Sequence, residues 1–358
     1  MQRNITYSIL KSLAVVALLC HAATAVHAQS APGAQRAILV TGASSGIGRK
    51  ITEVLAAQGH FVYAGARKPE DLAELGKIRN VQSVKLDVTV PSDIAAAVET
   101  IKRAGRGLYG VVNNAGIAIL APLIDVEERE LTSLFDVNVF GPYRVTKAFA
   151  PLLIESKGRV VTISSISGIL SGPFFGPYSM SKHAIEAYGD ALSVEMARFG
   201  VKVSLIEPGN YRSEIGRNTM AQVEAAFARL SGSPFEAQMR NMVAAMGGYD
   251  TYPEPDSVAS AAAHALFDAA PKMRYMVVPA VRQAEACALT WSPKPISAIR
   301  TRPRPARVLS AACISCQRSS SKVIGPRAAP GAVLGVMPDL KQCHFKCPKP
   351  PRAPSCTP

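Results

Sequence analysis

The chain has 358 residues, of which 48% are hydrophobic and 18% are charged, and this composition excludes a mainly disordered polymer. Its net charge of +14 is concentrated at one end. Residues 286–358 hold twelve of the 40 Lys and Arg and one of the 26 Asp and Glu, which leaves a net charge of +3 on the rest. This near balance argues against nucleic acid as a partner of the main domain.

The first 28 residues have the parts of a secretory signal peptide. Arg3 and Lys11 are followed by an apolar run at Leu13–Leu19, and Val26-His27-Ala28 provides small residues for cleavage. The run is shorter than the ~20 residues of a membrane-spanning helix, so we expect no stable membrane span. We predict cleavage after Ala28 and export or a periplasmic location, or a cytoplasmic one if the start of the chain is wrongly assigned.

Short apolar runs alternate with helical patterns through residues 29–285. Near-continuous apolar strands that alternate with helices are typical of a parallel sheet covered on both faces. The predicted fold class is therefore α/β, with a doubly wound, Rossmann-type parallel sheet in one domain. We expect strands at 37–40, 61–64, 84–86, 110–112, 160–163, 203–206 and 275–278, and helices at 47–58, 94–103, 127–149, 181–199 and 256–269.

The composition changes after Glu285. Residues 286–358 contain twelve of the 26 prolines and little periodic patterning, so we expect a tail that is disordered or foreign to the domain. Its cysteines include Cys313-x-x-Cys316 and Cys343-x-x-x-Cys347, but no predicted helix or strand frames this imprecise spacing, and we predict no metal site. Residues 29–285 lack cysteine, which excludes a thiol nucleophile there.

A glycine-rich turn, Thr41–Gly48, follows the first predicted strand. Glycines at 42, 46 and 48 would let the backbone approach a pyrophosphate at the positive end of the next helix. Their spacing differs from the commoner G-x-G-x-x-G, and Gly and Ser also form ordinary turns. The turn alone therefore indicates a dinucleotide site without establishing one.

Tyr178 and Lys182 are four residues apart in a predicted helical region, which places them on one face of a helix. An ammonium near the phenol would favour the phenolate. Lowering the pKa of a tyrosine from ~10 to ~7 requires about 4 kcal/mol of differential stabilisation, to which Lys182 could contribute. Without other motifs, the pair could equally be an exposed structural pair.

Four motifs occur in one order along the chain: Thr41–Gly48, Asn113–Gly116, Tyr178-Ser-Met-Ser-Lys182 and Pro208-Gly209. In this order and spacing they resemble the short-chain dehydrogenase/reductase family over residues 36–280, and more weakly its steroid and retinol dehydrogenase branch. The resemblance implies an enzyme acting on CH–OH groups that interconverts a secondary alcohol and a ketone or aldehyde by hydride transfer. The alternatives are a non-catalytic NADP-binding regulator and a C-terminally damaged, inactive family member.

The resemblance also assigns catalytic roles. Tyr178 would be the general acid/base, Lys182 its cationic neighbour and Ser165 a hydrogen-bond donor to the substrate oxygen, with Ser164 as the alternative. Asn138 would hold a water in a proton relay, or would simply be a buried amide that caps local backbone. The cofactor residues that the resemblance implies are Gly42, Ser44, Ser45, Gly46, Ile47, Gly48, Arg67, Lys68, Asp87, Asn114, Ala115, Gly116, Tyr178, Lys182, Pro208 and Gly209.

The end of the second predicted strand bears on the choice of cofactor. An acidic side chain there would bond the ribose hydroxyls of NAD and repel a 2′-phosphate, but the chain has Ala66, followed by Arg67 and Lys68. This favours NADP(H) over NAD, although a basic turn in solvent would look the same. Asp87 resembles the family acid near adenine, and Asn114 the residue that supports the central sheet.

Two segments are candidates for a substrate lid: Gly168–Pro177 and Met220–Met246 are apolar and contain several glycines or methionines. They favour a small hydrophobic alcohol or carbonyl compound as substrate. The long helices expected at 127–149 and 181–199 are similar to those that pair across two-fold axes in this family, which implies a homodimer or homotetramer.

Overall fold

The computed structural model describes residues 35–213, 215–219, 223, 227, 231–246, 251–279 and 299–300. All of them lie in the first of the chain's two units, residues 1–305. The predicted signal peptide lies outside the described residues, and so do the seven cysteines and all of the predicted tail except residues 299–300. The predictions about these segments stay predictions.

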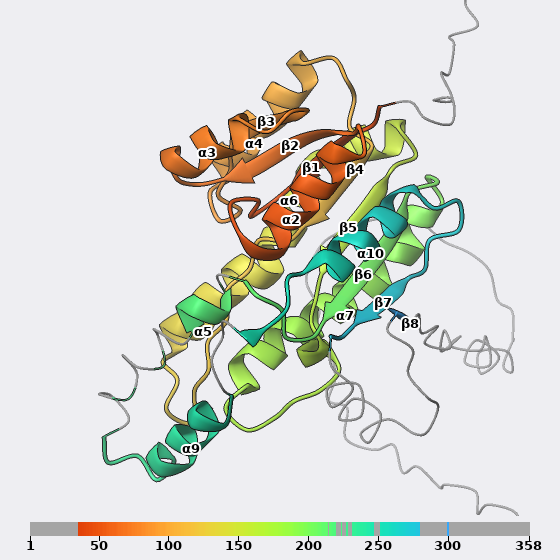
Figure 1. Ribbon diagram of the computed structural model, residues 1–358. Coiled ribbons are helices and arrows are strands. Elements are labelled where there is room, and N and C mark those ends of the chain that lie inside the picture. Colours follow the sequence, from red (N-terminus) through yellow and green to blue (C-terminus); the bar gives the residue numbers. More distant parts are fainter. Residues whose placement is uncertain are drawn as a thin grey trace, which may run out of the picture. The chain divides into compact units, whose positions relative to one another are not determined.

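Within the described part of the chain, the strands form one sheet in the order β3-β2-β1-β4-β5-β6-β7-β8 (Figure 1). All neighbouring pairs are parallel except β7 and β8. The order runs outward in opposite directions from β1 and β4, so the predicted doubly wound parallel sheet is confirmed. The strands are β1 (Ala37–Val40), β2 (Phe61–Ala66), β3 (Val81–Lys85), β4 (Gly110–Asn113), β5 (Arg159–Ile163), β6 (Lys202–Pro208), β7 (Arg274–Val277) and β8 (Ile299–Arg300).

Helices cover both faces of this sheet (Figure 1). One face packs against α2 (Gly46–Ala57), α3 (Pro69–Gly76) and α10 (Asp256–Phe267). The other packs against α4 (Pro91–Arg103), α6 (Gly141–Glu155) and α7 (Gly176–Ala197). Two further helices, α5 (Glu128–Phe135) and α9 (Glu236–Met246), complete the described set, and none of the described helices is long and apolar enough to cross a bilayer.

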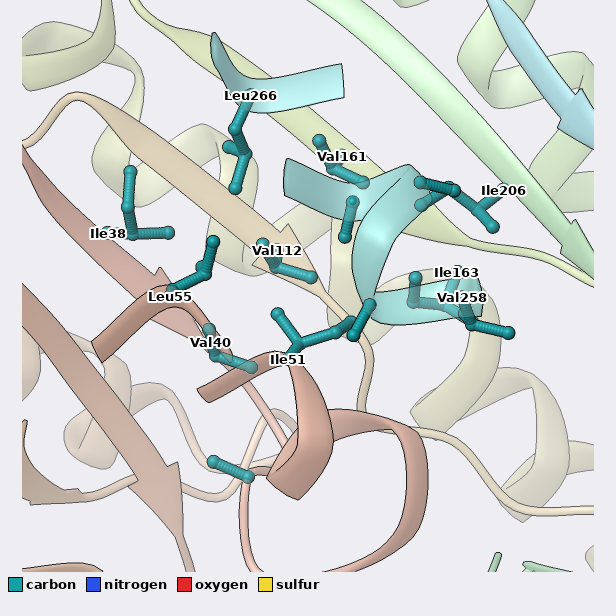
Figure 2. Close-up of a cluster of buried hydrophobic side chains, with 14 of the residues drawn as sticks. Ile38, Val40, Ile51, Leu55, Val112, Val161, Ile163, Ile206, Val258 and Leu266 are labelled. Atoms are coloured by element: carbon teal, nitrogen blue, oxygen red, sulfur yellow. The ribbon is translucent and has the colours of Figure 1, made fainter. Parts of the chain in front are cut away.

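The strands are apolar on both faces because the sheet separates two cores. In β1, Ile38 and Val40 enter the core shared with α2 and α10, whereas Ala37 and Leu39 enter the core on the opposite side. This follows from the period of two along a strand. Figure 2 shows the first core, where strand side chains meet those of α2 and α10. A continuous apolar run such as residues 37–40 is therefore the pattern expected of a strand covered on both sides.

The helical region expected at 127–149 is broken in the structure. A π-helical turn, η1 (Asp136–Phe140), separates α5 from α6. Such turns add a residue to the helical repeat, and the spacing of apolar residues in the sequence does not reveal them. Several boundaries also differ; for example, α7 begins at Gly176 rather than at 181 and α4 at Pro91 rather than at 94. The short helix α3 was not among the expected helices.

The sheet extends beyond its last parallel strand. Residues 299 and 300 form β8 and pair antiparallel with β7, with Val277 opposite Ile299 and Met276 opposite Arg300. These two residues belong to the region beyond 285 that was expected to be a separate tail. The sheet therefore includes part of that region.

Candidate active site

A cavity of about 1190 Å³ opens at the carboxyl ends of β1, β4, β5 and β6. This is where the strand order reverses, the position at which doubly wound sheets bind ligands. All sixteen predicted cofactor residues line the cavity, and Ser165 does so as well. Of the predicted site residues, Asn138 alone is not in its wall. The sequence motifs, which are separated by up to 160 residues, thus meet in one place.

The glycine turn forms one wall of the cavity from main chain. Gly42 and Gly46 have positive φ angles of 63° and 52°, a region in which side chains are strained. Gly48 has an ordinary φ, but a methyl group there would overlap the Gly42 carbonyl oxygen and the Asn114 amide. Glycine is required at 48 by close packing and at 42 and 46 by conformation. The cradle is therefore formed by backbone at these three positions.

Two polar side chains fix the turn to β4. The Thr41 hydroxyl accepts hydrogen bonds from the backbone N–H groups of Asn114 and Ala115, both at 3.0 Å. The Asn114 amide donates to the carbonyl oxygens of Thr41 at 2.9 Å and Gly42 at 3.0 Å. These four bonds join the first and second motifs. Asn114 is therefore a support of the cavity wall, as the family resemblance implies.

Helix α2 points its first turn at this cradle. The first N–H groups of a helix have no partners within the helix and carry its positive partial charge. The turn Gly46–Arg49 contains no acidic residue, and Ser45 makes no side-chain capping bond within the described part of the chain. The site therefore retains its affinity for an anion. Shape and charge both fit the pyrophosphate of a dinucleotide.

The opposite wall carries the predicted catalytic side chains. Tyr178 lies in the first turn of α7, and Ser165, just beyond β5, lines the same cavity and interacts with its phenol. The Ser165 oxygen also accepts a bond from the Ser167 backbone N–H at 3.1 Å, so its own proton is directed elsewhere. The Lys182 Nζ lies 5.6 Å from the centre of the Tyr178 ring and donates to the Ile163 carbonyl at 3.0 Å.

Burial controls the protonation of this pair. It raises the pKa of Tyr178 to about 12, partly opposed by the Ser165 hydrogen bond. It lowers the pKa of Lys182 to about 8, partly opposed by the Glu186 carboxylate. The expectation that Lys182 and a bound nicotinamide favour the phenolate stays a prediction for the complex, and burial opposes it in the protein on its own. At neutral pH Tyr178 is a neutral phenol, ready to donate a proton, above a protonated Lys182.

Asn138 lies behind the cavity wall, in the π-helical turn η1. Its Nδ2 donates to the Ile117 carbonyl at 2.9 Å and to the Ser181 hydroxyl at 3.0 Å, and its Oδ1 accepts from the Ile117 N–H at 2.9 Å. Ser181 in turn donates to the Tyr178 carbonyl at 2.7 Å. The Asn138 side chain therefore links the loop after β4 to the start of α7. Of the two hypotheses for Asn138, these contacts correspond to the second, a buried amide that caps local backbone.

The two serines after β5 have different surroundings. Ser165 lines the cavity and contacts the Tyr178 hydroxyl. Ser164 also lines it, but its hydroxyl is buried and has no hydrogen-bond partner among the described residues. Of the two candidates, the geometry favours Ser165 as the donor to a substrate oxygen.

The end of β2 is basic and lacks a carboxylate. Ala66 lines the cavity, and Arg67 and Lys68 follow it. The Arg67 guanidinium lies 3.9 Å from the Asp87 carboxylate and its side chain is 67% exposed, so this ion pair is weak and leaves the cation available to an anionic ligand. Asp87 accepts two bonds from Thr89, at 2.7 and 2.9 Å, which fix its carboxylate at the edge of the site.

The remaining wall is mainly apolar. Phe174 and Phe175 in the loop before α7 pack with Leu120 against residues of α9, including Met239 and Met242. This confirms contact between the two segments expected to form a lid, insofar as residues 220–246 are described. The sequence analysis missed Asn210 and Tyr252, which also line the cavity, because no motif marks them. The apolar lining residues are Ile117, Ala118, Leu120, Ile166, Ile169, Leu170, Phe175 and Ile215.

Comparison with known proteins places these features in a family. A family model described as short chain dehydrogenase matches residues 36–224. The oxidoreductase YbbO of Escherichia coli K12 is 35% identical over 245 residues, which are 68% of this chain and 86% of that protein. The NADPH-dependent 3-dehydrocapnine reductase of Ornithobacterium rhinotracheale is 36% identical over 261 residues, 68% of this chain and 88% of that protein. Mouse retinol dehydrogenase 5 is 34% identical over 262 residues, 69% and 82% of the two chains.

Solved structures agree. A short-chain dehydrogenase from Streptomyces avermitilis has a TM-score of 0.59 and 30% identity, covering 72% of this chain and 92% of its own. A short-chain dehydrogenase from Burkholderia cenocepacia J2315, in complex with NADP, has a TM-score of 0.55 and 25% identity, covering 73% and 95%.

Proposed function

We propose that the chain, which belongs to the short-chain dehydrogenase/reductase family, interconverts hydrophobic secondary alcohols and ketones or aldehydes with NADP(H). Membership of this family makes it an oxidoreductase that acts on CH–OH groups with a nicotinamide cofactor. Tyr178 is the general acid/base of this reaction. The grouping of Tyr178, Ser165 and the cationic Lys182 in the same cavity as the glycine cradle is the observation that carries the proposal.

Different residues of the cavity have different roles in this reaction. Ser165 donates a hydrogen bond to the substrate oxygen, and Tyr178 transfers a proton to or from that oxygen, which general acid–base catalysis accelerates by roughly 10²- to 10⁴-fold. Lys182, held on the Ile163 carbonyl, stabilises the phenolate that remains after proton donation. The cradle from Gly42 to Gly48 and the first turn of α2 would hold the dinucleotide, whose nicotinamide supplies or accepts the hydride when it is bound.

The preference for NADP(H) rests on the end of β2. The absence of a carboxylate at Ala66 removes the group that would repel a 2′-phosphate, and the exposed guanidinium of Arg67 can pair with one. Two of the related proteins point the same way, since one is named as NADPH-dependent and another was solved with NADP.

The substrate class rests on the apolar wall. Leu120, Ile169 and Phe175 line the cavity, and the last of these also packs on α9. One of the relatives is named for retinol, a hydrophobic alcohol. A hydrophobic alcohol or carbonyl compound fits this lining better than a charged one, because burying an unpaired charge there is costly.

Turnover of a graded series of ketones tests this substrate class. We expect NADPH-dependent reduction of methyl ketones with kcat/KM rising about fourfold for each added methylene, since burial of one CH2 contributes about 0.8 kcal/mol. The matched corresponding keto acids, which carry a carboxylate at the far end of the chain, serve as the control and should be poor substrates. Equal turnover of the ketones and the keto acids would contradict the proposed class.

Competitive binding tests the cofactor preference. Arg67→Ala should weaken NADPH binding by roughly 10- to 150-fold, the effect of one charge-assisted contact, and leave NADH binding almost unchanged. The Arg67/Lys68 double alanine variant should lose more, and Ala66→Asp should reverse the preference. Arg79→Ala is a control, because Arg79 lies elsewhere, in the turn before β3. Equal losses for NADH and NADPH would mean that the basic pair only supports the turn.

Self-association is part of the proposal. Phe140, Tyr143, Met180 and Val194 are large side chains between 45% and 76% exposed, on the η1, α6 and α7 segments that pair in the family. We propose a homodimer or homotetramer through these segments. Light scattering at micromolar concentration should give a multimer, and Val194→Lys should weaken it; a monomer would contradict the proposal.

A further inference from the structure

A row of side chains continues the catalytic pair along α7. Tyr178, Lys182, Glu186 and Asp190 follow one another at intervals of four residues, so they share one face of the helix. Glu186 is 2% exposed, whereas the Asp190 side chain is 43% exposed. The row therefore runs from the cavity through the interior of the protein toward the surface. Glu186 is the first group beyond Lys182, and the reaction described so far assigns it no part.

Arg274 of β7 holds the middle of this row. Its Nε donates to a Glu186 carboxylate oxygen at 2.8 Å, and its Nη2 donates to Asp190. The Glu207 carboxylate of β6 lies 3.5 Å from the same Nε. One buried guanidinium thus faces three carboxylates. Charges removed from water must be compensated, and the Lys182 ammonium, one turn from Glu186, supplies a second positive charge.

Packing leaves Glu186 little freedom. A Cβ atom at Gly168, in the 3₁₀ turn η2 (Ile166–Gly168), would lie 2.9 Å from the Glu186 Cγ and 3.1 Å from the Lys182 carbonyl oxygen. The second Glu186 carboxylate oxygen is buried and has no hydrogen-bond partner among the described residues. A carboxylate enclosed in this way is stabilised by nearby positive charge rather than by water. Arg274 orients this side chain, and Lys182 precedes it by one turn on the same face of α7.

We propose that Glu186 is a positioning residue of the reaction, whose carboxylate, oriented by Arg274, holds the side chain of Lys182 as an ammonium beside the phenol of Tyr178. The inference rests on the proposed function, because it gives Glu186 a role only through Lys182. The electrostatics agree with the geometry. Burial lowers the pKa of Lys182, and the charge of Glu186 raises it. Without this carboxylate, the buried amine would lose its proton at a lower pH.

The groups that face Lys182 come from several elements. Tyr178 and Glu186 belong to its own helix, while Arg274 of β7 and Glu207 of β6 act behind Glu186. From β5 and the loop after it come only uncharged groups, the Ile163 carbonyl and the two serine hydroxyls. Among the described residues, Glu186 is thus the nearest carboxylate along the row. Its removal should therefore dominate any change in Lys182.

The sign of the effect on catalysis follows. Ketone reduction requires the form in which both Tyr178 and Lys182 are protonated. Removal of the negative charge of Glu186 makes the Tyr178–Lys182 pair lose its first proton at a lower pH. The fall of kcat/KM at the high-pH end of the profile, its high-pH limb, therefore moves to lower pH. At low pH both groups are protonated with or without Glu186, and kcat/KM there changes little. A purely structural role would instead lower kcat/KM at every pH without moving the limb.

Glu186→Gln tests the inference, and Glu195→Gln is the matched control. Both changes remove one carboxylate from α7, but Glu195 is exposed and lies roughly 20 Å along the helix from Lys182. In Glu186→Gln we expect the limb for NADPH-dependent ketone reduction to move down by about one pH unit, with a low-pH plateau within about threefold of the parent. An unmoved limb, or an equal shift in Glu195→Gln, would overturn the proposal.

A spectroscopic titration separates this inference from the proposed function. In ¹³C-lysine-labelled protein without nucleotide, the Cε resonance that disappears in Lys182→Arg reports the protonation of Lys182. Its midpoint should fall in Glu186→Gln and stay in place in Glu195→Gln. An unmoved midpoint overturns the inference regardless of turnover. A lowered midpoint with an unmoved kinetic limb supports the Glu186–Lys182 coupling and contradicts the catalytic role of Lys182 in the proposed function.

A second variant covers the case in which Glu186→Gln does not fold. Loss of one partner from a buried ion pair is more destabilising than replacement of both by apolar residues. The Glu186→Met/Arg274→Met/Glu207→Met triple variant removes the buried guanidinium together with the two buried carboxylates that face it. The lysine midpoint should again fall, because Glu186 is the charged group that acts on Lys182. A midpoint equal to that of the parent protein would overturn the inference.

Discussion

The two walls of the cavity are built from different materials. On the side of β1 and α2, the wall is main chain, and its glycines matter because they lack side chains. On the side of α7, the wall is a set of buried titratable groups, of which Tyr178 and Lys182 have pKa values displaced by burial. The first wall is sensitive to added volume and the second to the position of a proton. Binding and chemistry can therefore be damaged separately.

The largest effect that sharpens this contrast is expected at Ser165. Ser165→Ala should lower kcat by roughly 10²- to 10³-fold, as for loss of one oxyanion-stabilising donor, while the NADPH Kd stays within a few-fold. Ser164→Ala removes the neighbouring hydroxyl, which makes no hydrogen bond among the described residues, and should have a small effect. Steady-state kinetics on both variants decides between them. A larger loss of kcat in Ser164→Ala than in Ser165→Ala would mean that Ser164 is the donor to the substrate oxygen.

Gly48→Ala should damage the other wall. The new methyl group would overlap the Gly42 carbonyl and the Asn114 amide, so the cradle must shift. We expect NADPH binding to weaken by roughly 10- to 100-fold, corresponding to ~1–3 kcal/mol of strain. Gly76→Ala is the control, since a Cβ atom there meets only the Ser83 hydroxyl at 3.7 Å. Unchanged calorimetric binding by Gly48→Ala would show that the pyrophosphate does not lie in this cradle.

Asn138 joins the two walls, and its removal should act on stability. Asn138→Ala would leave the Ile117 N–H and carbonyl without their buried partner, a loss of about 1–3 kcal/mol. In a domain of this size that corresponds to a fall in Tm of roughly 2–12 °C. Thermal unfolding with and without NADPH measures it. An unchanged Tm would show that the Asn138 hydrogen bonds do not contribute measurably to stability.

The sequence was most informative where function depends on short-range pattern. The apolar run 37–40, the glycine turn after it and the Tyr178–Lys182 spacing predicted a strand, a cradle and a helix face, and the structure contains all three in one site. These features are local, because each arises from residues within one element or one turn. The order of the motifs along the chain also indicates the family.

Long-range contacts could not be predicted in this way. Glu186 and Arg274 are 88 residues apart, and nothing in the sequence pairs them. The π-helical turn at Asn138 was missed because its irregular repeat lies inside an otherwise continuous helical pattern. The pKa of Tyr178 in the protein on its own also depends on long-range packing. The charge of Lys182 is visible in the sequence, but the desolvation that outweighs it depends on packing.

The central claim is that this cavity binds the nucleotide with one wall and performs proton transfer with the other. The most direct test measures the NADPH Kd and kcat together on one preparation of Tyr178→Phe, with Tyr188→Phe on the same helix as the control. We expect Tyr178→Phe to keep the Kd within a few-fold and to lose kcat by at least 10²-fold, because the phenol contributes a proton and little affinity. A Tyr178→Phe enzyme that retains more than a tenth of the parent kcat would contradict the account.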